Sequence, residues 1–318
     1  MTFRTYIDGN SVGHAAQHGH GKGGKKLVAG GQETTAIFGM LTSMHKLLKT
    51  RTASTPIVLW DGRSWRYERF DDYKGNRTDT KEKVAERERY RSQRAEMFKG
   101  LHLLGVSQLV AGNMEADDLA AILTRRAVAK GDSVTLITGD KDWIQLVQRG
   151  VAWQDHKIDR KCTASNFYEF TGFRTQRAFI DCKALAGDSG DNIKPNTGVG
   201  EDTAKKLFEV FDDAEDFLRT DLDMAQERYF LHHGKNMYHG AVKFHSDPEA
   251  QARFRWALEM MDLSHPTIPA PTNMRGTKAK IDRPAFEAFC AQHAFMSILK
   301  DVDRFIQPFQ ALEEEFNT

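Results

Sequence analysis

The feature that most constrains this chain is a short apolar run that ends in an acidic residue, which occurs three times. The runs and their acids are residues 3–7 with Asp8, residues 56–60 with Asp61, and residues 134–138 with Asp140. Apolar runs of this length, bounded by Gly and Asp, are typical of central strands in a parallel sheet. Ligands of such sheets bind beyond the carboxyl ends of the strands. Because Asp also favours turns, one such acid indicates little, but three in the same position predict a shared polar site.

The remaining pattern indicates an α/β fold followed by a helical region. Helical patterns lie between the apolar runs, at residues 34–49, 86–104 and 116–130. This alternation predicts a parallel-type central sheet with flanking helices. Beyond about residue 175 the pattern is mostly helical, at residues 176–185, 202–211, 250–263 and 284–305. We therefore expect an α/β domain over residues 1–175 and a helical domain or cap over residues 176–318.

Composition restricts the setting of the protein more than its function. The 318 residues have a formal net charge of +1, so any signal for nucleic acid must be local. Cys162, Cys182 and Cys290 are widely separated and odd in number, which fits neither a disulfide framework nor a thiolate metal site. The sequence shows no apolar signal core and no run long enough to cross a membrane. We expect a soluble protein of the cytosol, without a membrane partner.

A second group of acids lies in the segment GNMEADDLAAIL. Glu115 and Asp118 are three residues apart and share one helical face, with Asp117 beside them. Acids in a first helical turn are also favoured by the helix dipole and by capping. Taken alone, the segment is therefore more typical of an ordinary helix start than of a site.

Taken together, the acids of the chain indicate a site more strongly than any one of them does. The nine candidates are Asp8, Asp61, Glu115, Asp117, Asp118, Asp140, Asp142, Asp188 and Asp191. If the strand ends converge, like charges would raise one another's pKa unless cations neutralised them. Oxygen ligands without His or Cys select hard cations, so we predict two or more Mg²⁺ or Mn²⁺ ions. Two such ions about 4 Å apart are a standard device for phosphodiester hydrolysis.

The three histidines of residues 14–26 are a weaker candidate for metal binding. His14, His18 and His20 lie in a basic, Gly-rich segment. Because flexible glycines separate them, this segment favours a mobile loop over a soft-metal site.

A phosphodiester substrate requires basic residues, and these are concentrated in one segment. Residues 63–99 contain 12 Lys or Arg against 8 Asp or Glu. Within DDYKGNR, Tyr73 is placed to stack on a base, and Lys74 and Arg77 to contact phosphate. The following alternation of charges is also typical of a solvated helix with i,i+4 pairs. We expect residues 73–94 to be mobile without substrate, because they hold few large apolar residues.

The ordered set of motifs resembles the structure-specific 5′ nucleases, which comprise flap endonucleases and 5′→3′ exonuclease domains. The motifs are YIDGNS, VLWDG, DDYKGNR, EADD, TGDKDW, and GDSGDNI followed by GVGEDTAKKL. They cover about 200 residues in the order of that family. The resemblance implies a PIN-like nuclease core, a helical arch at about residues 73–95, and a helix–three-turn–helix motif in the helical region.

The resemblance also implies a role for each site residue. Asp8, Asp61, Glu115 and Asp117 would hold a first metal, Asp188 and Asp191 a second, and Asp118, Asp140 and Asp142 would be shared or outer ligands. Lys74 and Arg77, with Tyr73 beside them, would act on the scissile phosphate. The hairpin residues Gly198, Val199 and Gly200, with Lys205 and Lys206, would bind duplex DNA, with K⁺ as a further ion there.

This chain departs from the family pattern at the hairpin. Gly190 stands where a serine is common, and residues 194–197 replace a Pro-Gly-Val approach. Glu201 and Asp202 stand where neutral or basic residues are common. Acids beside a phosphate site should weaken duplex binding.

The expected function is metal-dependent 5′→3′ exonuclease and flap endonuclease activity during replication or repair. The expected partners are DNA with 5′ single-stranded ends or flaps, with RNA–DNA hybrids and replication proteins left open, and we expect a monomer of the phage or bacterial stand-alone type. One alternative is a non-catalytic protein that binds DNA structures, although all nine acidic positions are filled. A toxin-like single-strand ribonuclease is a third reading, but such chains are shorter and lack the hairpin.

Overall fold

The computed structural model describes residues 2–19, 26–50, 54, 56–78, 80–277 and 280–314. Its centre is a mixed sheet with the strand order β8-β7-β6-β1-β4-β5-β9. The strands are β1 Phe3–Asp8, β4 Pro56–Trp60, β5 Ser107–Val110, β6 Ser133–Ile137, β7 Val151–Gln154, β8 Lys161–Cys162 and β9 Arg275–Thr277. The five inner strands are parallel, and both edge strands are antiparallel. A short hairpin of β2 Val28–Ala29 and β3 Gln32–Glu33 lies apart from this sheet.

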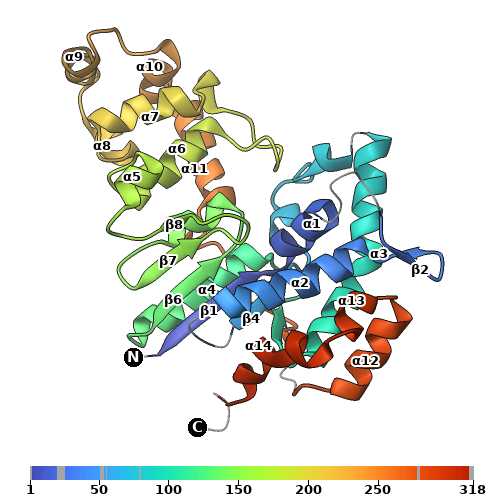
Figure 1. The fold of residues 1–318 in the computed structure, drawn as a ribbon. Helices are drawn as coiled ribbons and strands as arrows, with labels where there is room; N and C mark the ends of the chain where they lie inside the picture. Colours follow the sequence, from blue (N-terminus) through green and yellow to red (C-terminus); the bar gives the residue numbers. More distant parts are fainter. Residues whose placement is uncertain are drawn as a thin grey trace.

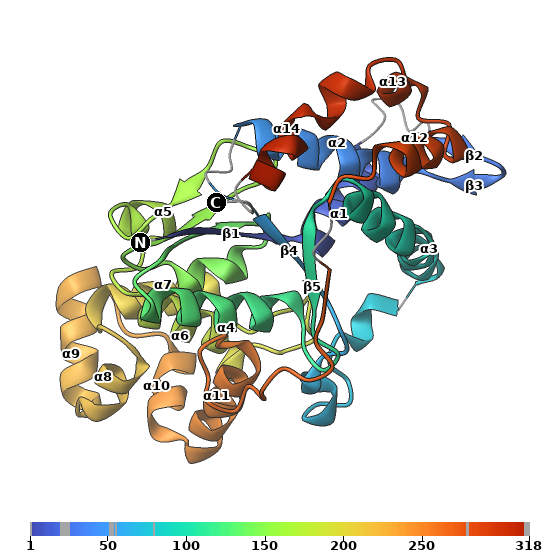
Figure 2. The same ribbon diagram turned by 90° about the horizontal axis from the view of Figure 1, so that it is seen from below.

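The sheet has helices on both faces, and the alternation of its strand residues explains why. Ile7 packs with one hydrophobic cluster and its neighbour Tyr6 with the other. Successive strand residues point to opposite faces, so both faces of an inner strand require apolar cover. Figure 2 shows α1 Gly9–Gly19, α2 Thr35–Thr50 and α14 Val302–Glu314 on one face, and α4 Ala116–Ala129 and α6 Gln176–Ala186 on the other. The three predicted inner strands and the predicted α/β class are confirmed.

The strand order places the three predicted acids together. The chain runs from β1 to β4 and β5 on one side, then returns to β6 on the other side of β1. Asp8 therefore ends β1, and Asp61 and Asp140 come shortly after β4 and β6, so the three acids lie at the carboxyl ends of three adjacent strands. Gly62 is needed at this edge because a Cβ there would lie 1.8 Å from the Ala111 carbonyl oxygen.

The helical region expected over residues 176–318 does not continue to the end of the chain. Helices α5 to α11 form a group at one end of the molecule (Figure 1). Their bounds are α5 Phe167–Thr171, α6 as above, α7 Glu201–Val210, α8 Ala214–Arg219, α9 Leu222–His233, α10 His239–Ser246 and α11 Pro248–Met261. The chain then returns to the core, where β9 pairs with β5 and the last helices pack against α2 and α3 Lys81–Leu103. A single boundary at residue 175 is therefore wrong for the residues from β9 onward.

Two predicted segments differ locally from the structure. The pattern at residues 284–305 is broken into α12 Arg283–Gln292, α13 Met296–Leu299 and the start of α14, with Ala294 at a φ of 57°. The predicted loop at residues 14–26 is wrong for His14 and His18, which lie in α1. His20 lies outside the described residues. None of the described helices has both the length and the apolarity needed to cross a membrane.

Candidate active site

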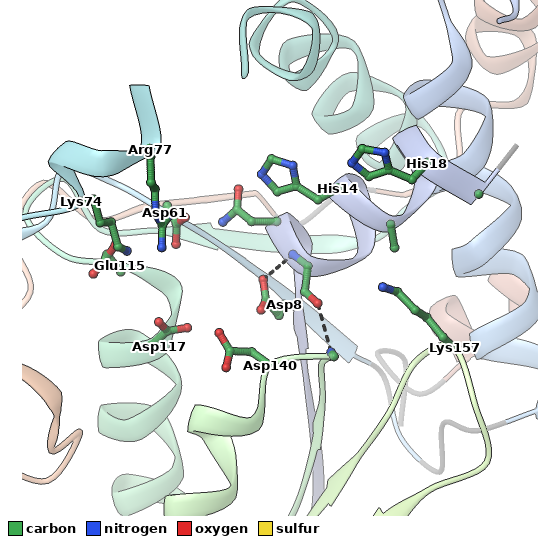
Figure 3. Close-up of a pocket in the computed structure, with 15 residues that line it drawn as sticks. Asp8, His14, His18, Asp61, Lys74, Arg77, Glu115, Asp117, Asp140 and Lys157 are labelled. Atoms are coloured by element: carbon green, nitrogen blue, oxygen red, sulfur yellow. Dashed lines mark hydrogen bonds and ion pairs between the residues drawn. The ribbon is translucent and has the colours of Figure 1, made fainter. Parts of the chain in front are cut away.

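Five of the nine predicted acids line one cavity at the carboxyl edge of the sheet. The cavity has a volume of about 590 Å³ and contains Asp8, Asp61, Glu115, Asp117 and Asp140 in its wall. Figure 3 shows Asp8, Asp117 and Asp140 facing the same space, with Asp61 and Glu115 beside Lys74 and Arg77. His14, His18 and Lys157 lie on the far side. The sheet topology thus brings together carboxylates that are up to 132 residues apart in the chain.

Neutral donors hold four of these carboxylates in place. Asp8 accepts hydrogen bonds from the Ser11 backbone N–H at 2.9 Å and the Thr138 hydroxyl at 2.8 Å. The Ala116 backbone N–H donates to Asp61 at 2.8 Å. The Trp143 indole N–H donates to Asp117 at 2.6 Å. The backbone N–H of Asp142 donates to Asp140 at 2.8 Å. These bonds orient the oxygens without cancelling their charge.

Four acids of the cavity have raised pKa values, because burial and neighbouring carboxylates outweigh the cations nearby. Burial, reinforced by the charge of Asp61, raises the pKa of Asp8 to about 7. Burial and the charge of Asp142 raise the pKa of Asp140 to about 6. The pKa values of Asp61 and Asp117 are also raised, by burial first and by neighbouring carboxylates second. Cations that bind oxygen would remove this repulsion, so the donor set fits hard divalent metals.

The spacing of the oxygens also suits metals that retain water. Among the described residues, no three of these carboxylates have oxygens that all lie within 4.8 Å of one another. An ion bound directly by three of them would need closer oxygens, because Mg²⁺–O bonds are about 2.1 Å long. Mg²⁺ commonly keeps several waters and one or two carboxylates. The cavity has the volume for such hydrated ions.

Glu115 differs from the other cavity acids because cations face it. Lys74 forms an ion pair with Glu115, and Arg66 Nη1 lies 3.3 Å from Glu115 Oε2. Burial alone would raise the pKa of Glu115, but the charges of Lys74 and Arg66 outweigh it and lower the pKa. Glu115 is therefore ionised and already paired, which makes it a link between the acid cavity and the basic segment.

Asp118 is not available as a metal ligand. Its side chain is fully buried and receives two hydrogen bonds of 2.8 Å from the guanidinium of Arg66. It also accepts from the Glu115 backbone N–H, so it caps α4. The predicted outer-ligand role is wrong because a bidentate ion pair occupies both oxygens. For this residue, the helix-start interpretation was the correct one.

Tyr73 cannot stack on a base as predicted. Its side chain is only 2% exposed, and its hydroxyl lies 2.8 Å from Glu115 and 2.9 Å from Asp191. Burial and these two carboxylates raise the pKa of Tyr73, so the hydroxyl remains protonated and a donor. Tyr73 therefore holds acids in position at the cavity wall.

The acids that follow β6 and α6 form a second group next to the cavity. Asp142 is ion-paired with Lys183, and Asp188 adds its negative charge to the surroundings of Lys183 and Asp140. Asp188 also accepts hydrogen bonds from its own loop, from the Gly190 N–H at 2.6 Å. Neither Asp142 nor Asp188 belongs to the described wall of the cavity. The structure therefore brings them to its border and not into it.

The loop of residues 187–193 is fastened to the start of the basic segment. Arg77 Nη2 lies 2.9 Å from Asp191 Oδ1, and Arg77 Nε donates to the Gly190 carbonyl at 3.0 Å. Lys74 Nζ lies 3.7 Å from Asp191. Gly187 makes this loop possible, because it has a φ of 73° and a Cβ there would lie 2.4 Å from the Ile193 carbonyl oxygen. Asp191 thus contacts the two cations expected to bind phosphate.

A second cavity, which is strongly basic, adjoins the first. Its volume is about 860 Å³, and six residues line both cavities: Asn10, His14, Asp61, Lys74, Arg77 and Glu115. Its cations are Arg63, Lys74, Arg77, Lys83, Arg87, Arg91 and Arg94. Most of these belong to α3, whose residues Tyr90 and Gln93 are buried. The expectation that residues 73–94 make few buried contacts is therefore wrong for the second half of that segment.

The predicted hairpin has two exposed glycines on either side of a buried residue. Gly198 and Gly200 are exposed, and Val199 between them is fully buried. Gly198 has a φ of 74°, and Gly200 caps α7 without a side-chain hydrogen bond. Lys206 is exposed and Lys205 half-buried on that helix. The acids Glu201 and Asp202 occupy its first turn and are exposed, as the sequence suggested.

Several residues of the site were missed from the sequence. Arg66 and Lys183 carry the two main counter-charges, but single basic residues in helical patterns give no signal of a buried partner. Asn10 and Ser11 line the cavity and directly follow the first acid, so the motif YIDGNS contained a signal that could have found them.

Comparison with known proteins decides the family. The model of the 5′-3′ exonuclease N-terminal, resolvase-like domain matches residues 4–172, which include most of the acid cavity. The chain belongs to the 5′-3′ exonuclease family. DNA polymerase I from Thermus thermophilus is 33% identical over 180 residues, which cover 56% of this chain and 21% of the polymerase. DNA polymerase I from Lactococcus lactis subsp. lactis (strain IL1403) is 34% identical over 218 residues, which cover 64% of this chain and 24% of the polymerase.

These two DNA polymerases are much longer than the segment that matches this chain. The chain spans only about a fifth to a quarter of the length of these relatives. Solved structures match over nearly the whole chain. The T5 5′-exonuclease with bound zinc ions has a TM-score of 0.63 at 21% identity and covers 98% of each chain. The catalytic core of Rad2 with a DNA substrate has a TM-score of 0.54 at 15% identity, over 96% of this chain and 91% of that one. These matches confirm the predicted fold, including the helical region.

Proposed function

We propose that this protein is a divalent-metal-dependent 5′ nuclease that hydrolyses phosphodiester bonds at 5′ ends and flaps of DNA. The observation that carries the proposal is the pair of adjoining cavities, one acidic and one basic, with Lys74, Asp61 and Glu115 in the wall of both. A phosphodiester at this border would meet metal ligands on one side and phosphate-binding cations on the other. Membership of the 5′-3′ exonuclease family supports the same reaction.

The metals would be Mg²⁺ or Mn²⁺, in agreement with the all-oxygen donor set. The acids of the cavity wall would hold them: Asp8, Asp61, Glu115, Asp117 and Asp140. Asp188 and Asp191 would take part once their loop is released from Arg77. When bound, such ions activate water and stabilise the leaving oxygen.

The residues of the chain itself would bind and orient the substrate. Lys74 and Arg77 are paired with Glu115 and Asp191 in this structure. A phosphate that enters the border of the two cavities would compete for these cations, which are strong bidentate or point-charge donors. Tyr73 would keep Glu115 in place during this exchange, because its hydroxyl donates to that carboxylate. The cations of α3 would guide the single strand toward the border.

The proposal also covers what the hairpin of residues 198–200 binds and which partners the protein has. The exposed backbone of Gly198 and Gly200 would contact a duplex phosphate, with K⁺ as an ion at that contact. T5 D15 flap endonuclease has been crystallised with DNA and metal ions, which supports DNA as the ligand. We propose a monomer of the cytosol, in keeping with three free, buried cysteines. RNA–DNA hybrids and replication proteins are further candidates as substrate and partner.

A cleavage assay with a matched pair of variants tests the function. A 5′-labelled flap substrate is incubated with Mg²⁺ and with wild type, Asp117→Asn or Asp223→Asn, the last being an exposed acid of α9. We expect cleavage near the flap base by wild type and Asp223→Asn, and a loss of about 10² or more in rate for Asp117→Asn. Binding of the flap in Ca²⁺ without cleavage in Mg²⁺ or Mn²⁺ would instead favour the non-catalytic alternative.

A further inference from the structure

A second group of metal-ligating side chains lies outside the acid cavity, where α7 and α9 meet. Glu209, His232 and His233 each offer one ligand atom, and these three atoms all lie within 4.8 Å of one another. Among the residues that the structure describes, this is the only group of three or more His, Cys, Asp or Glu side chains that approach so closely. Glu209 is in the last turn of α7, and the two histidines end α9.

The hydrogen bonding of His233 fixes which ring nitrogen is free. His233 Nε2 lies 2.9 Å from the backbone carbonyl oxygen of Lys206. A carbonyl oxygen can only accept, so Nε2 must carry the proton and donate. In a neutral ring, Nδ1 then presents its lone pair. Histidine ligands of metals typically donate their other ring N–H to a carboxylate or a backbone carbonyl, as His233 does here.

The free nitrogen of His233 faces a carboxylate. Nδ1 lies 3.8 Å from Glu209 Oε2, so two electron-rich atoms oppose each other unless a cation lies between them. A proton on Nδ1 would give an ion pair, and a metal ion would give two coordinate bonds. The His232 ring lies next to that of His233, with 4.6 Å between their centroids. Three possible ligand atoms therefore lie within 4.8 Å of one another, which a simple ion pair does not require.

We propose that Glu209, His232 and His233 form a binding site for a divalent transition metal of the Zn²⁺ class that fastens α9 to α7. Two imidazoles and one carboxylate are a ligand set that Zn²⁺ accepts, with a water as fourth ligand. Tetrahedral Zn²⁺ needs ligand atoms about 3.4 Å apart, from bond lengths of about 2.1 Å. The Glu209 side chain is 42% exposed and can make this small closure. The site is distinct from the proposed oxygen-ligated metals.

The test measures Zn²⁺ binding by the metal-stripped full chain in excess Mg²⁺. The Mg²⁺ occupies the oxygen sites and competes poorly for imidazole. Equilibrium dialysis compares wild type with the ligand variants His232→Gln and Glu209→Gln. Both variants change side chains that are exposed or half-exposed. His239→Gln is the control. His239 is an exposed histidine on the neighbouring helix α10. Hydrogen exchange of residues 222–233 is followed with and without Zn²⁺.

Wild type and His239→Gln should bind one equivalent of Zn²⁺ at least about tenfold more tightly than His232→Gln and Glu209→Gln. Mutating a residue that only hydrogen-bonds to a metal ligand already costs about tenfold in metal affinity, and these two variants remove a ligand itself. Zn²⁺ should slow amide exchange in α9 of wild type and His239→Gln only. Equal Zn²⁺ affinity and stoichiometry in all four proteins would overturn the proposal and leave an ion pair of His233 with Glu209. An equal loss of binding in His239→Gln would overturn it too, since binding would then be unspecific. Neither result bears on flap cleavage in Mg²⁺.

Discussion

The guanidinium of Arg77 lies 2.9 Å from a carboxylate oxygen of Asp191. A residue proposed to contact phosphate and a residue proposed to hold metal thus neutralise each other in the substrate-free chain. Lys74 repeats the arrangement with Glu115. Metal binding would free the two cations from their carboxylates, and phosphate binding would free the two carboxylates from their cations. Binding of metal and binding of phosphate should therefore favour one another.

The first prediction concerns Asp188 in the loop that carries Asp191. Asp188→Asn should lower the rate of Mg²⁺-dependent cleavage strongly, by about 10² or more, because it removes a ligand that stabilises the transition state. DNA binding in Ca²⁺ should remain largely intact, since many phosphate contacts carry affinity. Asp223→Asn is the control for loss of one negative charge. Normal cleavage by Asp188→Asn would remove this residue from the metal site.

The second prediction is that divalent metal stabilises the fold. Mg²⁺ should raise the melting temperature, because a ligand that binds only the native state adds about 2.7 kcal/mol at a hundred times its Kd. Asp117→Asn should raise the stability of the metal-free protein, since it removes a buried carboxylate whose neighbours repel it. It should also reduce the Mg²⁺ effect. Calorimetry with and without Mg²⁺ measures both, and identical melting in the two conditions would contradict the convergence of the acids.

The third prediction is a pH dependence of metal-free stability. Burial raises the pKa of Asp8 to about 7 and that of Asp140 to about 6, from an ordinary value of 3.8. At pH values between the unfolded pKa of 3.8 and the raised folded pKa values, the folded chain binds more protons than the unfolded chain. The free energy of unfolding therefore falls as pH rises through this range. The decline should lie between about pH 4 and pH 7, and each group contributes on the order of 1.4 kcal/mol per unit of its pKa shift. Urea unfolding at several pH values checks it, and stability that rises over this window would refute it.

The fourth prediction concerns the buried ion pair of Arg66 with Asp118. Arg66 is 3% exposed and also donates to the Met260 carbonyl at 2.6 Å. Arg66→Ala should cost about 3–5 kcal/mol, because it leaves Asp118 charged and buried without a partner. Replacing both residues, as Arg66→Met with Asp118→Leu, should recover most of the loss. Thermal or urea unfolding compares the variants, and a single variant as stable as wild type would show that the pair is dispensable.

The sequence was sufficient for the three adjacent strands β6, β1 and β4 and for most of the acid cavity. Asp8, Asp61 and Asp140 each follow an apolar run, and parallel strands place their carboxyl ends at one edge. The edge strand β9 could not be foreseen, because its three residues, Arg-Gly-Thr, have no apolar pattern. Its pairing with β5 forms only because the chain comes back to the sheet after the helical region. The boundary at residue 175 was wrong for the same reason.

The errors at the site arose where a side chain has two chemically reasonable uses. Tyr73 can stack on a base or donate from its hydroxyl, and the acids around it decided the second use. Asp118 can bind a metal or cap a helix, and Arg66 decided the second. Local sequence gives no sign of a partner 52 residues away. By contrast, Asp117 faces other acids and a neutral indole in the described part of the chain, and its pattern-based role stays a prediction.

The last prediction separates catalysis from binding at the border of the two cavities. Lys74→Ala should lower the cleavage rate more than the affinity for a flap, because Lys74 lines both cavities, whereas six other cations of the basic cavity remain to bind the flap. Arg125→Ala, an exposed cation of α4, is the matched control. If the basic cavity admits a free 5′ strand, a bulky group attached to the 5′ end before the enzyme is added should inhibit cleavage strongly. Single-turnover rates and Ca²⁺ binding curves measure the two effects. A blocked flap cut as fast as a free one, with Lys74→Ala changing affinity alone, would make the segment from Tyr73 to α3 an ordinary DNA-binding surface with no part in the chemical step.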